Sequence, residues 1–339
     1  MIIITGTYPP ELCGVADYTY NLLKTPTAVN NNWHLVYTKD ARISNFRSTV
    51  RLIKSFNDNS INIQYPSRGY AKSILPHLIC LYFRIFTKVK ISVTIHEYTQ
   101  LGWKGHLLAY ILLIFAHKLI FTNDYEMSAA IKKCSIAKCK SSVIKIYSNI
   151  PSSTVQKKIS SRVYDVGYFG FIRPQKGLEN YISTIKEVLK ERPNLKAYIM
   201  GNTLPDLKDY AEKIIGKAQR CGITFFEGKS ETEVADILSD TKISLLPFPD
   251  GLSERRGSFM ASAKNHAIII STNGKFVTPE QRELLIIDNP DQMVSHVSDV
   301  LNGSTEKQDV MQKNVQLYVE RNLPASWDDV AQSYYKLLL

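Results

Sequence analysis

Short apolar segments alternate with amphipathic segments along almost the whole chain of 339 residues. The apolar segments are rich in β-branched residues and end in glycine or polar residues, which is typical of buried strands. Residues 177–192 carry leucine and isoleucine at spacings of three to four, which predicts a helix packed by one face. This alternation favours parallel sheets with helices on both faces. The predicted strands are 1–6, 34–38, 61–65, 90–98, 119–123, 143–148, 164–170, 195–201, 223–228, 243–248, 267–272 and 284–288.

A polar segment at 149–162 interrupts the alternation. It contains a proline and four serines without a sustained period, so we interpret it as a linker. The chain is also long enough for two domains. We therefore expect an α/β protein with two Rossmann-like, doubly wound domains, at 1–152 and 153–324, and a C-terminal helix at 325–339. Ligands of such sheets bind beyond the carboxyl ends of the strands, so a cleft between the domains is the expected site.

The chain is basic, with a formal net charge of +11 and a pI near 9.2. Such a charge indicates an acidic partner, which could be nucleic acid, a phosphorylated ligand or an anionic membrane face. The five cysteines form no CxxC pair, which argues against a disulfide framework or a metal cluster. The N-terminus lacks the pattern of an export signal. We therefore expect a cytoplasmic protein.

Two long apolar stretches, 73–86 and 107–121, are shorter than a membrane-spanning helix requires. They predict buried helices. The alternative is a face that rests on a membrane, because basic residues lie near both stretches. These residues are Arg84, Lys88, Lys90, Lys104 and Lys118.

Arg173 and Lys176 lie in the sequence GYFGFIRPQKGLENYI, between a predicted strand and a predicted helix. An arginine fork and a lysine three residues apart can reach one diphosphate. A solvated loop in a basic protein is the alternative. Near the N-terminus, Gly14 follows Pro9 and Pro10 and begins a helical run, where a glycine allows close approach of a ligand to the backbone.

A second basic loop, FPDGLSERRGSFMASAKNH, places Glu254, Arg255 and Arg256 before Gly257, Ser258 and a helical run. The arginines and the free N–H groups of a helix start could together hold an anion. The carboxylate would accept hydrogen bonds from neutral hydroxyls, as on a sugar. Alternatively, the loop is solvated and Glu254 pairs with an arginine.

These motifs occur in a characteristic order along nearly the whole chain. A Pro-Pro pair with a following glycine comes first, then GFIRPQKG, then LLPFPDG leading into SERRGSFMASAKNHAIIIST, and finally SWDDVAQSYYKLL. In this combination the chain resembles family 4 of the retaining glycosyltransferases, which have the GT-B architecture. The resemblance implies transfer of a sugar from a nucleotide diphosphate, usually UDP or GDP, without cofactor or metal ion; of the two we expect UDP. It also implies that the last helix packs on the first domain.

The resemblance carries roles to particular positions. Arg173 and Lys176 correspond to the pair that stabilises the leaving diphosphate, and His96 to a histidine near the transferred sugar. Glu254, as the first of two family glutamates, completes the expected catalytic set. The expected donor-binding residues are Gly14, Gly201, Asn202, Glu227, Gly228, Lys229, Arg255, Arg256, Gly257 and Ser258. From the residues alone, a hydrogen-bonded structural role for His96 remains open.

The sequence departs from the family pattern at its paired glutamates. Counting back from AIIIST places Ser253 at the first position, next to Glu254, and Ala261 at the second. The second glutamate, usually a ribose contact, is therefore absent. The basic loops still suit the expected reaction, because cations at the phosphate stabilise its developing charge. The departing phosphate can take the acceptor's proton, so the reaction requires no protein base.

The expected partners are a nucleotide-diphosphate sugar and a glycan acceptor carried on a lipid. We also expect peripheral contact with an anionic membrane, on the inner face of the plasma membrane, and a role in surface polysaccharide synthesis. Two alternatives are a nucleotide-sugar epimerase on the same fold and a non-catalytic protein that binds nucleic acid. The first needs a carboxylate pair around the sugar, and the second a continuous basic stripe with aromatic residues. We expect neither, and no nucleic acid partner.

Overall fold

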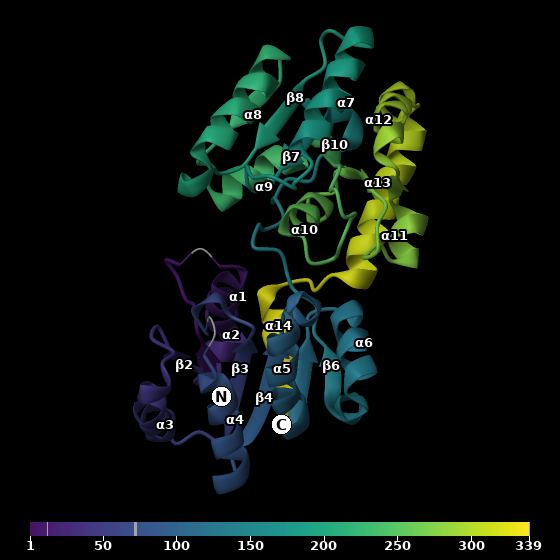
Figure 1. The fold of residues 1–339 in the computed structure, drawn as a ribbon. Coiled ribbons are helices and arrows are strands. Elements are labelled where there is room, and N and C mark those ends of the chain that lie inside the picture. The colour runs from purple at the N-terminus through teal and green to yellow at the C-terminus, as the bar shows by residue number, and fades with distance from the viewer. Residues whose placement is uncertain (12, 71–72, 339) are drawn as a thin grey trace. The chain divides into compact units, whose positions relative to one another are not determined.

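The computed structural model describes residues 1–11, 13–70 and 73–338. It divides into two compact units, one formed by Met1–Tyr147 with Pro324–Leu339 and the other by Ser148–Leu323. Each unit is built around its own parallel sheet (Figure 1).

The first unit has a six-stranded parallel sheet in the order β2-β1-β3-β4-β5-β6. Its strands are β1 (Ile2–Thr5), β2 (His34–Tyr37), β3 (Ser60–Tyr65), β4 (Lys90–Ile95), β5 (Lys118–Phe121) and β6 (Ser141–Val143). Its helices are α1 (Gly14–Leu23), α2 (Pro26–Asn30), α3 (Phe46–Ser55), α4 (Leu75–Phe86), α5 (Trp103–Phe115), α6 (Asp124–Lys133) and α14 (Trp327–Leu338).

Both faces of this sheet are buried. Ile2 and Ile4 of β1 pack into one apolar cluster, and Ile3 between them packs into a second cluster on the other face. Successive side chains of a strand point to opposite faces, so a run of isoleucines suits a strand covered on both sides. This explains why the strand candidates were continuous apolar runs in the sequence.

The C-terminal helix α14 packs within the first unit, although the chain reaches it from the second (Figure 1). Its Tyr334 is fully buried, and its hydroxyl lies 2.9 Å from that of Tyr18 in α1 and 2.7 Å from Oγ1 of Thr94 in β4. The backbone N–H of Thr27 also donates to Asp328 at 2.8 Å. These contacts fix the helix against α1, α2 and the sheet.

The second unit has a six-stranded parallel sheet in the order β12-β11-β10-β7-β8-β9. Its strands are β7 (Tyr164–Phe169), β8 (Ala197–Met200), β9 (Thr224–Phe226), β10 (Thr241–Leu246), β11 (Ile268–Thr272) and β12 (Ile286–Asp288). Its helices are α7 (Leu178–Glu191), α8 (Lys208–Arg220), α9 (Glu231–Ser239), α10 (Gly257–Lys264), α11 (Pro279–Leu284), α12 (Met293–Asn302) and α13 (Thr305–Asn322).

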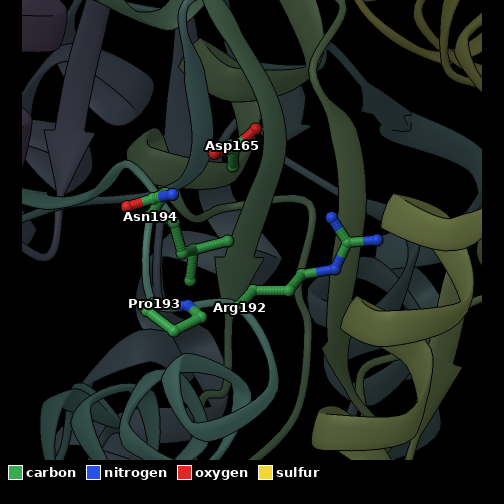
Figure 2. A pocket seen from close by; sticks show the side chains of 5 residues that line it. Asp165, Arg192, Pro193 and Asn194 are labelled. Carbon is green, nitrogen blue, oxygen red and sulfur yellow. The ribbon is translucent and has the colours of Figure 1, made fainter.

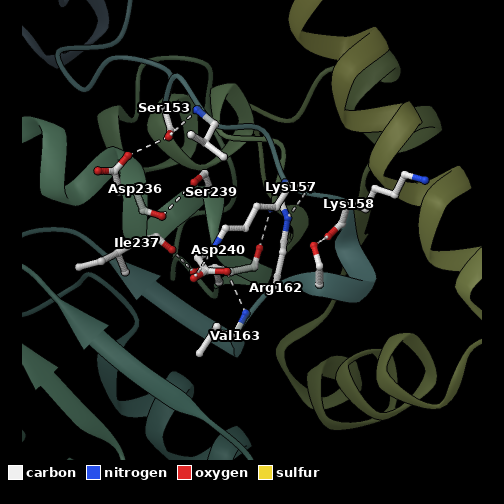
Figure 3. Close-up of polar contacts among 12 residues, drawn as sticks. Ser153, Lys157, Lys158, Arg162, Val163, Asp236, Ile237, Ser239 and Asp240 are labelled. Carbon is white, nitrogen blue, oxygen red and sulfur yellow. Dashed lines mark hydrogen bonds and ion pairs between the residues drawn. The ribbon is translucent and has the colours of Figure 1, made fainter.

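The segment expected to be a linker is anchored to the second unit instead (Figure 3). The N–H of Ser153 donates to Asn265 at 2.8 Å, and its hydroxyl donates to Asp236 at 2.8 Å. Arg162 is buried and donates to the carbonyl oxygen of Thr241 at 2.8 Å. Lys157 pairs with Asp240 at 2.9 Å. The expected boundary had placed residues 148–152 in the first unit. In the structure they belong to the second unit.

Two further sequence predictions need correction. A strand was expected over 143–148, but β6 ends at Val143. Its neighbour β5 ends at Phe121, whose carbonyl oxygen accepts the last ladder bond from Ile144 at 2.9 Å, so later residues lack a strand to pair with. The apolar stretch 107–121 is not one helix, because α5 ends at Phe115 and β5 begins at Lys118.

Candidate functional site

The strand order of the second sheet reverses between β7 and β10. From β7 the chain continues outward through β8 and β9, and then returns on the other side of β7 as β10. In open parallel sheets, ligands bind outside the carboxyl ends of the strands at such a reversal. The segments that leave this point are residues 170–177, which follow β7, and residues 247–256, which follow β10. Both basic loops of the sequence therefore start at the same place.

The two segments touch through their backbones at Gly177. This glycine has a φ of +80°, and a Cβ atom there would lie 2.0 Å from the carbonyl oxygen of Pro247. Only glycine suits that combination of conformation and contact. The hydroxyl of Tyr168 in β7 donates to the carbonyl oxygen of Lys176 at 3.1 Å. The turn thus holds Lys176 beside the loop that follows β10.

Arg256, in the second of these segments, is largely buried. Its side chain is 14% exposed and pairs with Asp250. The guanidinium carbon lies 3.9 Å from the ring centre of Phe248. Its Nε is buried and has no hydrogen-bond partner among the described residues. A buried N–H donor without a partner is costly, so this atom is available for an anion that enters the site.

The positive charges of the two segments act on one another. Burial, together with the neighbouring charges of Arg173 and Arg256, lowers the pKa of Lys176 to about 8. Burial also lowers the pKa of Arg256, whereas the negative charge of Asp250 raises it. Positive charges held close together in a partly desolvated site raise the positive electrostatic potential of that site. Arg255 lies against Phe276, with its guanidinium carbon 5.2 Å from the ring centre.

Helix α10 starts beside these cations. Arg256 occupies its N-cap position, but no side chain caps the first turn. A Cβ atom on Gly257 would meet nothing within 4 Å, whereas one on Gly170, at the end of β7, would lie 3.7 Å from Cβ of Ser258. The first turn of α10 therefore presents N–H groups next to the end of β7. An anion held by Arg256 would also be favoured by these groups and by the helix dipole.

A chain of three hydrogen bonds orients Glu254. The N–H of Thr278 donates to Oε1 of Gln281 at 3.0 Å, so the amide nitrogen of Gln281 faces the other way. That nitrogen donates to the hydroxyl of Tyr318 at 3.1 Å, and the hydroxyl in turn donates to Oε1 of Glu254 at 3.1 Å. Because both Gln281 and Tyr318 are buried, the direction of the chain is fixed. The carboxylate of Glu254 is held by residues of α11 and α13.

The structure also shows what occupies the two positions of the family's paired glutamates. Ser253 is buried, whereas Glu254 is partly exposed. Ala261 is fully buried in a cluster with Tyr198, Met200 and Leu238. A carboxylate at position 261 would be desolvated among apolar groups, so this position is part of the core.

The loops after β8 and β9 are bonded to each other. Glu227 accepts hydrogen bonds from the N–H and the hydroxyl of Thr203, at 3.1 and 2.6 Å, and Asn202 accepts one from the N–H of Gly228 at 3.1 Å. Lys229 pairs with Glu233 at 3.0 Å. Gly201 packs so closely that a Cβ atom there would lie 1.8 Å from the carbonyl oxygen of Gly170. This contact joins the loop after β8 to the segment that contains Arg173 and Lys176.

Gly14 and His96 belong to the first unit. Gly14 is exposed at the start of α1, whose first turn lacks a side-chain cap, and a Cβ atom there would meet nothing within 4 Å. His96 follows β4 and is buried, with Nε2 2.7 Å from Oε1 of Gln64 and its ring edge-on to Tyr18. Burial lowers the pKa of His96 to about 3, so the ring is neutral. These contacts favour the structural alternative for His96.

In the part of the chain that the structure describes, no group of three or more His, Cys, Asp or Glu residues could hold a metal ion. A cavity of about 260 Å³ is lined by residues around the amino ends of β7 and β8, the edge of the sheet opposite to the basic loops (Figure 2). Its lining residues are Asp165, Arg192, Pro193, Asn194 and Leu195.

Sequence reasoning missed several residues of this site. Asp250 and Phe248 lie in the same loop as Arg256, and their spacing before the arginines was a usable signal. Tyr318 and Gln281 had no such signal, because they come from helices distant in the sequence and resemble ordinary buried residues. The cluster that results contains Arg173, Lys176 and Arg256, with Glu254 held nearby by Tyr318.

No protein-family model and no curated protein sequence matches this chain. Several solved structures match the chain. HepE from Anabaena, crystallised with UDP and glucose, matches with a TM-score of 0.72 at 12% identity, over 100% of this chain and 99% of that one. A glycosyltransferase from Rickettsia africae matches with a TM-score of 0.72 at 11% identity, over 99% of this chain and 97% of that one. Sucrose-phosphate synthase from Thermosynechococcus elongatus matches with a TM-score of 0.68 at 12% identity, over 99% of this chain and 97% of that one. The chain therefore has the GT-B fold of these enzymes.

Proposed function

We propose that this protein is a retaining glycosyltransferase, similar to those of family 4, that transfers a sugar from a UDP-sugar to a glycan acceptor. The observation that carries the proposal is the convergence of Arg173, Lys176 and Arg256 on the uncapped start of α10, at the strand-order reversal of the second sheet. UDP is preferred over GDP because HepE was solved with UDP and glucose, and a similar protein from Escherichia coli with UDP-2-fluoro glucose.

The basic cluster suits the departure of a nucleoside diphosphate. The bond between the anomeric carbon and the phosphate oxygen breaks, and negative charge develops on the leaving group. Arg173, Lys176 and the N–H groups at Gly257 and Ser258 would stabilise that charge, and the unpartnered Nε of Arg256 supplies a further donor. The acceptor oxygen forms the new bond on the same face of the sugar, and the departing phosphate takes its proton. In this mechanism the cations supply the stabilisation that a metal ion would otherwise give.

We assign the following roles to the other residues that the resemblance indicates. Glu254 accepts hydrogen bonds from hydroxyls of the transferred sugar. The pyrophosphate and the base of the donor are lined on one side by the loops after β8 and β9, through Gly201, Asn202, Glu227, Gly228 and Lys229. Arg255 lines the donor on the other side. Gly14 approaches the donor phosphates through the open first turn of α1. His96, as a neutral and buried ring, positions the backbone at the end of β4 rather than contacting the sugar.

The proposed acceptor is a glycan carried on a membrane lipid, for surface polysaccharide synthesis. Support comes from the apolar and basic segments 73–90 and 103–118 of the first unit. No helix within residues 1–11, 13–70 and 73–338 is long and apolar enough to cross a membrane. Any membrane contact in this proposal is therefore peripheral for that part of the chain.

The reaction can be tested by following UDP-glucose and UDP-N-acetylglucosamine by phosphorus NMR, with the protein and lipid-linked oligosaccharide acceptors. We expect free UDP to form together with a new glycan whose anomeric configuration matches that of the donor. Inversion would contradict the retaining mechanism. An epimerised UDP-sugar without UDP release would identify an epimerase instead.

The affinity for UDP should depend on pH through Lys176. Below pH 8 the side chain is charged in the free protein and attracts the diphosphate. Above pH 8 it must take up a proton on binding, so the affinity should fall by up to about tenfold per pH unit. Calorimetric titrations from pH 7 to 9 check this. In Lys176→Arg, whose side chain stays charged, the slope should be much smaller; equal slopes would contradict the assignment.

Tyr318→Phe should lower kcat while the protein stays folded. The change removes the donor that orients Glu254 and leaves the amide of Gln281 without its acceptor, which costs about 1–3 kcal/mol of stability. We expect kcat to fall about tenfold. Tyr181→Phe is the matched control, because it removes a buried hydroxyl that donates to backbone carbonyls of the same unit. If the two variants lose stability and activity alike, Tyr318 has no positioning role.

A further inference from the structure

Helix α5 has an apolar face on each side. Ala109, Leu112 and Leu113 are buried in the core of the first unit. On the opposite side, Trp103, Leu107 and Ile114 are 74%, 65% and 43% exposed. Their spacings of four and seven residues place them on one stripe along the helix. A contiguous exposed apolar stripe on a globular unit usually marks an interaction surface.

The end of α4 extends this stripe. Ile85 and Phe86, in its last turn, are 61% and 71% exposed. Helices α4 and α5 pack against each other. Their C-terminal ends are joined by a hydrogen bond between Arg84, near the end of α4, and His117, which follows α5. Ile85 and Phe86 therefore lie at the Ile114 end of α5. We call Ile85, Phe86, Trp103, Leu107 and Ile114 the α5 face.

The surroundings of the α5 face are strongly basic. Between residues 73 and 121 the sequence has five lysines and arginines but a single acidic residue, Glu97. The five basic residues are all exposed, and Lys104 lies 5.2 Å from the ring centre of Trp103. These cations are Arg84, Lys88, Lys90, Lys104 and Lys118. The charge is therefore complementary to an anionic surface.

We infer that the α5 face docks on an anionic lipid membrane, with α5 lying along the membrane surface. Helices at a membrane interface combine a tryptophan- and leucine-rich face with flanking lysines, as α5 and its neighbours do. Each lysine or arginine near anionic lipid adds an attraction that is lost at high salt. A second copy of the chain would carry the same positive charge on this face, so electrostatics oppose self-association through it.

The position of α5 links this surface to the acceptor. Helix α5 starts shortly after β4, so Trp103 lies near the carboxyl edge of the first sheet, and Ile114 near the opposite edge. A membrane along the α5 face would therefore lie beside the edge where β1 and β4 end. The idea that this contact delivers a lipid-borne acceptor rests on the proposed function. The inference that the α5 face docks on a membrane does not rest on it.

The inference is tested by flotation of the full-length protein with vesicles of phosphatidylglycerol and phosphatidylcholine in equal amounts. At low salt the protein should float with these vesicles and not with pure phosphatidylcholine. Leu107→Glu/Ile114→Glu should reduce the floated fraction at least about tenfold. Val29→Glu, which changes an equally exposed apolar residue of the same unit, should float like the wild type. Wild-type protein that stays in the soluble fraction would overturn the inference.

The electrostatic part has its own pair of variants. Lys88→Glu/Lys90→Glu should weaken binding to the anionic vesicles at least about tenfold, whereas Lys213→Glu/Lys217→Glu, an equal charge change in the second unit, should have a much smaller effect. Equal effects would mean that only net charge matters. Self-association that the α5-face variants abolish in sedimentation velocity would identify a protein interface instead. UDP should raise the melting temperature of all these variants as in the wild type, which separates this inference from the donor site.

Discussion

Replacing Lys176 by alanine is expected to lower the rate of sugar transfer by about 10²- to 10³-fold, and Arg173→Ala by a similar factor. In the proposed mechanism both cations lie where the leaving diphosphate develops charge, and burial makes the charge of Lys176 more effective than it would be in water. Because the interaction strengthens as the bond breaks, kcat should fall more than the affinity for the donor. Turnover of a UDP-sugar under single-turnover conditions measures this loss.

The matched control for this prediction is Lys196→Ala. Lys196 is exposed just before β8, at the edge of the same sheet opposite to the basic loops. Its removal changes the net charge equally and should leave transfer unchanged. If Lys176→Ala and Arg173→Ala keep most of their activity while remaining folded, these residues do not carry the reaction.

The second large effect is expected from Gly177→Ala, which should destabilise the second unit by at least about 3 kcal/mol. A side chain at a φ of +80° costs about 1–2 kcal/mol by itself. The added Cβ would also overlap the carbonyl oxygen of Pro247 and push the loop after β10 away from Lys176. Urea unfolding should therefore show a lower midpoint, and the remaining folded protein should bind UDP more weakly.

Gly222 provides a control with nearly the same backbone. Its φ is +79°, but a Cβ atom there would meet nothing within 4 Å. Gly222→Ala should therefore cost only the conformational strain, and its affinity for UDP should be that of the wild type. Equal losses of stability in the two variants would show that the contact between Gly177 and Pro247 is unimportant.

Much of the fold follows from local patterns in the sequence. Runs such as Ile2, Ile3 and Ile4 can only be buried in a sheet covered on both faces, and the alternation with helices predicts parallel pairing. The errors lie where tertiary contacts decide. Residues 143–148 have strand-like composition, but the partner strand ends at Phe121. The linker composition of 149–162 did not reveal the polar contacts of Ser153 and Arg162.

The candidate site was accessible to sequence analysis only in part. Arg173, Lys176 and Arg256 stand out because each follows a predicted strand, and the topology brings the ends of β7 and β10 together. The orientation of Glu254 could not be predicted, since Tyr318 reaches it from a helix far along the chain. The buried contacts of Ala261 were equally hidden, because an alanine near a helix start has no sequence signature of burial.

In the proposed function, the basic cluster of the second unit binds a nucleoside diphosphate. The most direct measurement is the melting temperature of the wild type and of Arg173→Ala/Lys176→Ala with UDP, GDP and ADP and their sugar conjugates. A ligand that binds the native state stabilises it, so UDP and a UDP-sugar should raise the melting temperature of the wild type by several degrees. The double variant should not respond. A wild type that responds to no nucleotide, or a double variant that responds equally, would contradict the account.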